Sequence, residues 1–205
     1  MRNRIALALA LCAAAAPLHA QRADSVYHGP GYDLVLPARY RYITSHDRVE
    51  EGERIRAYVF GSSGGALVVV RLEPGTQLTD TSLVTRRAVL QIMHAATVQK
   101  AGDMRLTGEP VEIVRDDRVT LRAPVVMARD GVTVRGTVDL SVARRGPVVV
   151  WMVTAVREHP GPRDEETARR TLDSFALTGA GDPALDDGVI VEAGTKRVDD
   201  LDAKP

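Results

Sequence analysis

Cysteine is almost absent from this sequence. The chain has 205 residues and a single cysteine, Cys12, which lies in an apolar segment near the N-terminus. The rest of the chain therefore has no thiol for catalysis, for a disulfide or for a cysteine-ligated zinc site. The histidines show no metal-ligand spacing, so we expect neither a metal site nor a cofactor. A chain of this size is long enough to be stabilised by its hydrophobic core alone.

Aromatic residues and an excess of one charge are also scarce. Aromatics make up 4% of the residues, and 27 basic side chains balance 27 acidic ones. Binding of nucleic acid calls for a clustered basic face with interleaved aromatics, and we expect no such partner. A hydrophobic content of 44% and a charged content of 26% are typical of a globular domain.

No apolar run is long enough to cross a membrane. The longest covers residues 5–16, against the ~20 residues that a spanning helix needs. Arg2 and Arg4 precede this run and the small residue Ala20 follows it, the order of a secretory signal peptide. The pattern predicts a Sec-type signal over residues 1–20, cleaved after Ala20, and a periplasmic or extracellular protein without a transmembrane segment in the mature chain.

A lipoprotein signal ending at Cys12 is the alternative. It is disfavoured because Leu11 stands where a lipoprotein signal carries a small residue, and because no polar tether follows Cys12.

Alternation of apolar and polar residues predicts antiparallel strands in two parts of the chain. The first part contains two strands joined at residues 61–65, and the second is a meander over residues 104–158. Asp130-Gly131 is the strongest hairpin signal, because a type I′ turn needs positive φ at both central residues. Residues 148–153 are apolar on both faces, which predicts a central strand with Trp151 in the core.

A spacing of three or four residues predicts helices over 81–100 and 162–176. In the first helix, the stripe expected to face the sheet contains Leu83 or Val84, Ala88, Ile92, Ala95 or Ala96, and Gln99. In the second, it contains Ala168, Thr171, Leu172 and Phe175. The predicted fold class is α+β: an antiparallel β-sheet of about six or seven strands flanked by these two helices.

The same patterns divide the chain into segments. After the signal peptide we expect a short leader over 21–30, a single domain over 31–179 and a flexible acidic tail over 180–205. We expect a monomer.

Two short signatures resemble the PsbP/DcrB-like superfamily of exported or organellar α/β/α sandwich proteins. The first strand opens with Gly31-Tyr32, continues through Leu34 and ends at Pro37, and the closing helix runs into Leu172-Asp173-Ser174-Phe175. The resemblance covers residues 31–179. The family often has a tryptophan shortly after the first proline, where this chain has Tyr40. The resemblance implies a non-enzymatic accessory, partner-binding or chaperone-like domain with no shared catalytic residues.

The residues 61–65 match the G-x-S-x-G pattern of a hydrolase nucleophile elbow. That elbow joins a strand to a helix, whereas a second strand is predicted here, so the glycines indicate a hairpin. A serine hydrolase using Ser62 or Ser63 with His46 or His159 is therefore the least favoured hypothesis, and we expect no enzyme.

Five tyrosines are concentrated between residues 27 and 58, and tyrosine is favoured at interfaces. We interpret residues 38–48 as a tyrosine-rich loop whose Tyr40, Tyr42 and His46 contact a partner. The predicted function is a non-catalytic exported domain that binds a protein or a cell-envelope partner. The alternative is a carrier of a small apolar ligand or lipid, which would enclose an apolar cavity.

Overall fold

Eight antiparallel strands form the main sheet of the protein. The structure is a computed structural model, and it describes residues 24–50, 52–73, 82–100, 104–129, 131–178, 189–191 and 196–197. The predicted signal peptide lies outside these residues. In spatial order the sheet contains β3 (Arg41–Glu50), β4 (Glu53–Ser62), β5 (Gly65–Glu73), β10 (Val150–Arg157), β9 (Val132–Ala143), β8 (Arg118–Arg129) and β6 (Met104–Leu106), and β7 (Val111–Val114) also pairs with β8.

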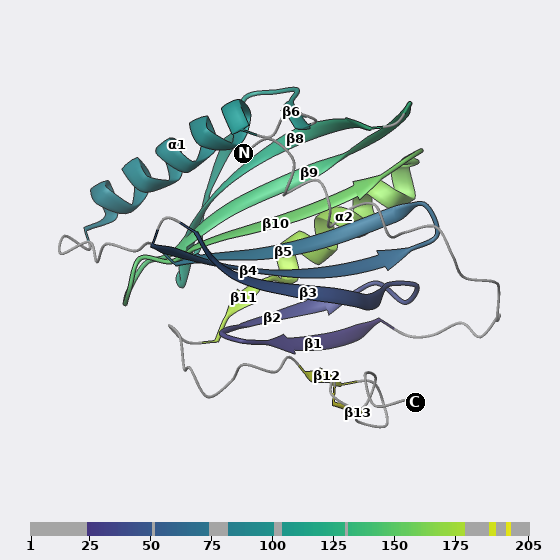
Figure 1. Ribbon diagram of the computed structural model, residues 1–205, viewed down its shortest axis with the longest axis horizontal. Helices are drawn as coiled ribbons and strands as arrows, with labels where there is room; N and C mark the ends of the chain where they lie inside the picture. Colours follow the sequence, from purple (N-terminus) through teal and green to yellow (C-terminus); the bar gives the residue numbers. More distant parts are fainter. Residues whose placement is uncertain are drawn as a thin grey trace.

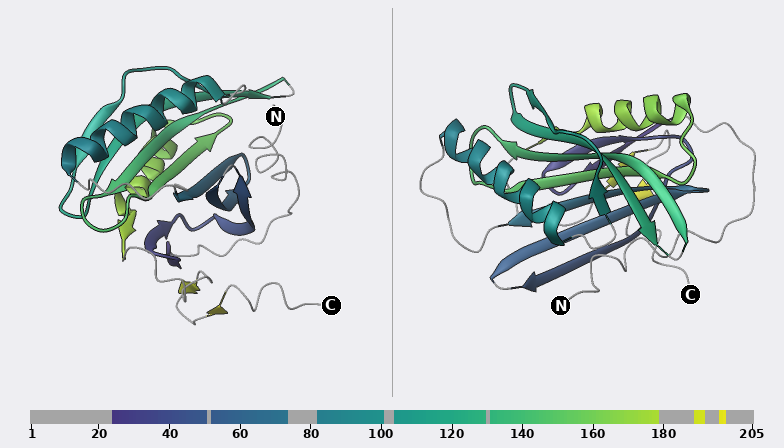
Figure 2. Two further views of the ribbon diagram at one scale, coloured as in Figure 1. Left: turned by 60° about the vertical axis from the view of Figure 1, so that its left-hand side comes forward. Right: turned by 90° about the horizontal axis from the view of Figure 1, so that it is seen from above.

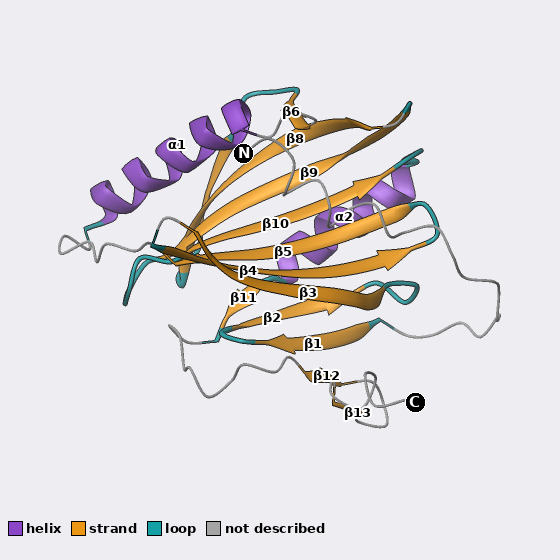
Figure 3. Cartoon of the chain, in the orientation of Figure 1, coloured by secondary structure: helices purple, strands orange, loops and turns teal. Residues whose placement is uncertain are grey.

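A small sheet and two helices cover the main sheet. The small sheet has the order β11 (Ala176–Leu177), β2 (Tyr32–Leu36), β1 (Ser25–Gly29), β12 (Val189–Val191) and β13 (Lys196–Arg197). Helix α1 (Leu83–Lys100) lies on one face of the main sheet, while α2 (Pro162–Ser174) lies on the other (Figures 1 and 2). Strand β2 contacts α2, so the β1–β2 hairpin and α2 share one layer (Figure 3). We call the two faces of the main sheet the α1 face and the α2 face.

The predicted α+β class, the antiparallel sheet and both helices are confirmed. The helices begin and end within two residues of the predicted limits. Helix α2 ends before Phe175, whose backbone is extended and leads into β11. The main sheet has more strands than the six or seven expected, because β3 and the short β6 carry no clear alternation.

Both predicted hairpins are present and have two-residue turns. Ser62 pairs with Gly65 at the β4–β5 turn, and Arg129 pairs with Val132 at the β8–β9 turn. Gly64 and Gly131 have φ angles of 77° and 80°, which residues with a Cβ rarely adopt. Strand β10 lies at the centre of the main sheet, as its apolar composition predicts, and Trp151 is buried.

The chain enters the fold earlier than the predicted leader allows. Residues 25–29 form β1, which pairs with β2 over five residues, and Tyr27 is only 1% exposed. A tyrosine in the core cannot belong to a leader, so the expectation for 21–30 is wrong from Ser25 onward.

Part of the predicted flexible tail is also paired. Residues 189–191 form β12 on the outer edge of β1, and 196–197 form β13. The remaining residues of 180–205 lie outside those that the structure describes.

The predicted stripe of α1 faces the wrong way. Val84 and Ile92 are 75% and 67% exposed, whereas Arg86 and Leu90 are fully buried against the sheet. The Arg86 guanidinium donates hydrogen bonds to the carbonyl oxygens of Ala143 and Gly146 in the loop after β9. Because a buried arginine interrupts the apolar pattern of the inward face, the outward face is the more regular apolar stripe in the sequence.

Candidate functional site

The residues proposed to contact a partner lie on a strand, and the predicted loop over 38–48 is wrong from Arg41 onward. Strand β3 carries Tyr42 and His46, while Tyr40 stands just before it. The sequence of β3, RYITSHDRVE, shows no continuous alternation, because a β-bulge between Tyr42 and Thr44 shifts the register by one residue.

Tyr40 and Tyr42 make their contacts within the protein. Tyr42 is half-buried, its ring centroid lies 6.0 Å from that of Phe60, and its hydroxyl donates a hydrogen bond of 2.9 Å to Ser45 Oγ. Tyr40 is half-buried against the same core, and its backbone N–H donates to the carbonyl oxygen of Pro37. His46 is exposed. Of the three residues, His46 is therefore the most available to a partner.

Strand β3 is the outer strand of the main sheet. It is ten residues long and pairs with β4, and no other described strand pairs with its outer edge. Backbone N–H and C=O groups at such an edge are available to a further strand. The bulge blunts the start of the strand, but pairing with β4 is regular from Thr44 to its end.

Side chains of β3 beyond the bulge point to both faces. His46 and Arg48 pair with Ala57 and Ile55 on the α1 face, while Ser45, Asp47 and Val49 pair with residues of β4 on the α2 face. Val49 is 70% exposed. We call residues 44–49 of β3 the open edge.

The carboxylate at the open edge is bound in an ion pair within the protein. Asp47 accepts hydrogen bonds from Nε and Nη2 of Arg54 at 3.0 and 2.6 Å, and Nε of the buried Arg56 lies 3.5 Å from its Oδ2. The hydrogen bonds from Arg54 lower the pKa of Asp47. The open edge therefore presents a carboxylate that is already bound within the protein, beside the cations of the neighbouring strand.

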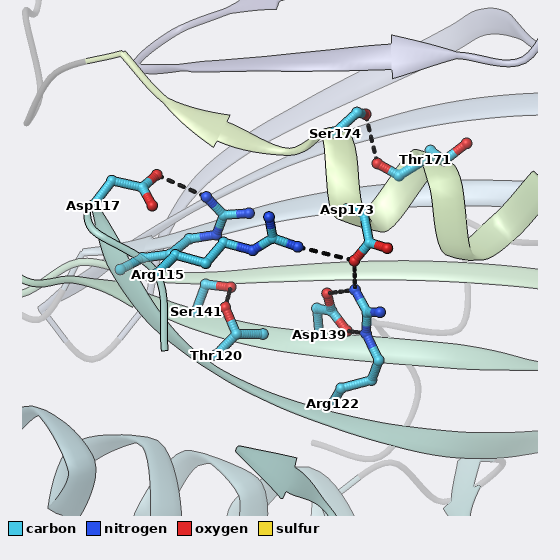
Figure 4. A network of polar contacts seen from close by, with 10 residues as sticks. Arg115, Asp117, Thr120, Arg122, Asp139, Ser141, Thr171, Asp173 and Ser174 are labelled. Carbon is cyan, nitrogen blue, oxygen red and sulfur yellow. Dashed lines mark hydrogen bonds and ion pairs between the residues drawn. The ribbon is translucent and has the colours of Figure 1, made fainter. Parts of the chain in front are cut away.

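The densest polar network lies on the α2 face, far along the sheet from β3 (Figure 4). Arg122 donates to both carboxylate oxygens of Asp139 at 2.7 Å and to Asp173 of α2 at 3.0 Å. Arg115, from the turn after β7, also donates to Asp173 at 3.0 Å. Burial raises the pKa of Asp139, and the two hydrogen bonds from Arg122 oppose that shift. The network joins the C-terminal end of α2 to two strands.

Two buried arginines bracket an aromatic pair at the same end of α2. The guanidinium carbon of Arg71 lies 5.3 Å from the ring centroid of Trp151, and that of Arg118 lies 5.4 Å from the ring centroid of Phe175. The two ring centroids are 5.9 Å apart. Arg118 also donates to Asp117 at 2.7 Å. Stacking on a ring partly compensates for the burial of each guanidinium, and the ion pair with Asp117 does so further for Arg118.

The hydroxyl groups of this network are arranged for packing. Thr120 and Ser141, buried on neighbouring strands, share a hydrogen bond of 2.7 Å, and Ser174 donates to the carbonyl oxygen of Thr171. Ser174 also accepts a hydrogen bond from the backbone N–H of Val35. None of these partners is a general base. The arrangement closes the helix end and shows no activated nucleophile among these residues.

The serines of the G-x-S-x-G pattern lie at the β4–β5 turn, away from the histidines that could activate them. His46 pairs with Ala57, five residues before Ser62 on β4 and so about 17 Å along the strand. The backbone of Glu158 reaches the turn, since its N–H donates to the carbonyl oxygen of Gly64. The side chain of His159, however, is 88% exposed, and its nearest charged group is Glu158. Within the described segments, no hydrogen bond joins these serines to a histidine.

Two further features are absent from the described residues. These residues contain no group of three His, Cys, Asp or Glu side chains placed to hold a metal ion. Neither described helix has the length and apolarity that a membrane span requires.

Comparison with known proteins identifies structures with a similar fold. No protein-family model matches the sequence, and none of the curated proteins is similar to it. The structure is similar to the solution structure of the cyanobacterial PsbP protein CyanoP from Synechocystis, with a TM-score of 0.50 and 13% identity over 80% of this chain and 97% of that one.

Two crystal structures are similar at lower scores. LpqN of Mycobacterium tuberculosis, described as involved in cell envelope biogenesis, has a TM-score of 0.46 and 11% identity over 74% of this chain and 86% of that one. A protein of Bacteroides thetaiotaomicron has a TM-score of 0.47 and 7% identity over 76% of this chain and 49% of that one. The chain thus spans about half the length of the Bacteroides protein.

The predicted PsbP-like fold is confirmed by the similarity to CyanoP. Identities this low establish the fold alone, because one fold hosts many functions.

Proposed function

We propose that this protein is an exported, non-catalytic accessory domain that binds a protein partner along the open edge of β3. The observation that carries the proposal is the edge itself: a ten-residue strand at the end of an eight-stranded sheet, with regular pairing on one side and no described strand on the other. Export follows from the signal peptide that the sequence predicts.

Addition of a strand is the binding mode that fits this edge. In that mode, main-chain hydrogen bonds supply affinity, while alternate side chains supply specificity. Val49 offers an apolar contact on the α2 face, and the exposed His46 imidazole offers a polar contact on the α1 face. A partner segment with an apolar residue opposite Val49 and a hydrogen-bonding side chain opposite His46 complements this edge.

The described residues give no support to a catalytic role. The clustered charges of the α2 face are bound to one another, and the candidate serines and histidines lack the contacts of a catalytic set. The carrier of a small apolar ligand or lipid stays a prediction.

Site-specific photocrosslinking tests the proposal. A photoreactive amino acid at His46 or Val49, in the full chain expressed in its own host, should give one crosslinked polypeptide in each case. The matched control is Thr133, an exposed residue of β9, which is separated from β3 by β4, β5 and β10. The same product at Thr133, or no product at either β3 position, would contradict the proposal.

A second variant tests the mode of binding. Replacing His46 with proline removes one backbone N–H from β3 and should abolish the crosslink formed from position 49, whereas His46→Ala should leave most of it. Equal loss with both variants would assign binding to the His46 side chain. Circular dichroism establishes that both variants are folded.

A further inference from the structure

The outer face of α1 carries an apolar stripe, which includes the exposed but uncharged Gln91 and is bordered by Arg87. Val84 is 75% exposed and Ile92 is 67% exposed, and Ala88 and Ala95 between and beyond them are also exposed. A surface helix of a soluble protein normally carries charged residues on this side. The stripe extends from Val84 to Ala96, about 18 Å along the helix at 1.5 Å per residue.

The arginines of α1 are used inside the protein. Arg86 is fully buried and donates to backbone carbonyls after β9. Arg87 donates from Nε and Nη2 to the two carboxylate oxygens of Glu112 on β7, at 3.1 and 2.6 Å. Neither charge is directed along the outer stripe, so two such stripes meet without repulsion between like charges.

The stripe is complementary in shape to itself. Val84, Ala88, Ile92 and Ala96 are spaced four residues apart and form one ridge in which large and small side chains alternate. When two such helices run antiparallel with a two-fold axis level with Leu90, Val84 of one copy lies opposite Ala96 of the other. Ala88 then lies opposite Ile92, and every large side chain faces an alanine.

We propose that two copies of this chain associate through the outer faces of α1, packed antiparallel about a two-fold axis. The interface is isologous, since the same residues serve both copies. This inference does not depend on the proposed function, because β3 and α1 contact different parts of the sheet.

A lipid surface is the competing occupant of an apolar helix face. Helices that lie on membranes carry lysine and arginine beside the apolar stripe, where these side chains meet anionic headgroups. The arginines of α1 are instead buried or bound to Glu112, so the observations favour a second copy.

The expected association is weak. One helix pair buries less than the ~800 Å² per partner of a stable interface, so we expect dissociation in the micromolar to millimolar range. The sequence alone leads us to expect a monomer, and a concentration series tests one expectation against the other.

Analytical ultracentrifugation of the full chain, from about 1 µM to about 1 mM, tests the proposal directly. The wild type should shift from monomer towards dimer, and Ile92→Glu should remain monomeric throughout. The matched control is Val111→Glu, which places the same charge on an exposed valine of β7 on the α2 face and should dimerise like the wild type. A monomeric wild type at the highest concentration, or equal dimerisation of Ile92→Glu, would overturn the proposal.

Disulfide trapping tests the register. In a Cys12→Ser background, the double variant Val84→Cys/Ala96→Cys should oxidise to a covalent dimer, while Val84→Cys alone should do so far less because Ala96 lies opposite it. Equal crosslinking of both variants would overturn the antiparallel register.

Flotation with anionic vesicles tests whether a membrane surface occupies the stripe instead of a second copy. The wild type should not float with vesicles of phosphatidylglycerol and phosphatidylethanolamine. Flotation that Ile92→Glu abolishes would assign the stripe to a membrane surface and overturn the dimer.

Discussion

The two faces of the main sheet are built from different residues. All eight aromatic side chains of the chain belong to the core cluster of the α2 face or pack against it. The core clusters of the α1 face contain only aliphatic residues and methionine. The buried ion pairs also lie on the α2 face, around Arg122 and Asp139.

The layers on the two faces are therefore attached to the main sheet by different kinds of interaction. Aromatic rings supply large contact areas and accept stacked arginines, so the α2 face can bury charge and remain compact. Small aliphatic side chains offer no polar contacts to a packed layer. Helix α1 is therefore attached to the sheet by burial of its inner side chains and by the hydrogen bonds of Arg86. We expect core substitutions to cost more stability on the α2 face than on the α1 face.

Trp151→Ala is expected to have the largest effect on stability. It removes the largest ring of the α2 core, leaves a cavity, and takes the stacking partner from Arg71, at a cost of about 4 kcal/mol. Urea unfolding followed by far-UV circular dichroism measures the change. A loss below about 2 kcal/mol would mean that the α2 face relaxes as readily as an aliphatic one.

Asp139→Ala tests the buried charge of the same face. Without this carboxylate the Arg122 guanidinium keeps only Asp173, and we expect a loss of about 3 kcal/mol. Asp139→Asn is the matched control, since it retains the shape and one acceptor and should lose less. Equal losses would show that packing, and not the charge of Arg122, governs the site.

Leu90→Ala and Ile92→Ala test the orientation of α1. Leu90 is fully buried and its truncation should cost about 3 kcal/mol, whereas Ile92 is exposed and should cost less than about 0.5 kcal/mol. The same urea titrations, at a protein concentration low enough to exclude self-association, give both values. Comparable losses from the two variants would contradict the orientation described above.

Tyr32→Phe removes one hydroxyl from the centre of the aromatic core. That oxygen makes no hydrogen bond of ordinary geometry among the described residues, although the Tyr27 hydroxyl interacts with it, and burial raises the pKa of Tyr32 well above its usual value. Because a buried hydroxyl with so poorly aligned a partner costs free energy, we expect little loss of stability and a gain of up to ~1 kcal/mol. A clear loss would show that the hydroxyl is satisfied within the core.

Asp47→Asn should have the smallest effect, and its effect depends on pH. The pKa of Asp47 is lowered in the folded protein, so its stabilisation is complete above the unfolded pKa of about 3.9 and is lost as pH falls through the folded value. For a partly exposed pair we expect about 0.5 kcal/mol at pH 7 and almost none at pH 2. A difference that persists at pH 2 would assign the effect to packing.

The sequence predicts most of the elements, because their signals are local. Asp130-Gly131 and the glycines at 61–65 mark hairpins, and the apolar residues 148–153 mark the central strand. The face of α1 could not be predicted in this way. A fully buried Arg86 counts as a surface residue in any periodicity argument, and only the carbonyl oxygens that it meets after β9 explain its position.

The candidate site was harder to predict than the fold. Tyr40, Tyr42 and His46 draw attention in the sequence because of their chemistry, yet the place of Tyr42 and His46 on an outer strand depends on pairing with distant residues of β4. A bulge at Ile43 removes the alternation that would reveal the strand. The position of Tyr27 was also predicted wrongly. It lies in the expected leader, but its side chain is buried in the core.

The confinement of aromatic residues to one face also gives the molecule an internal optical probe. Trp151 is its only tryptophan and is buried between Arg71 and Phe175, so its emission reports the environment beneath α2. Helix α1 contains no chromophore of this kind and contributes instead to the far-ultraviolet signal of backbone amides. Recording both signals during unfolding would show whether the two layers of this protein separate from the sheet together or one after the other.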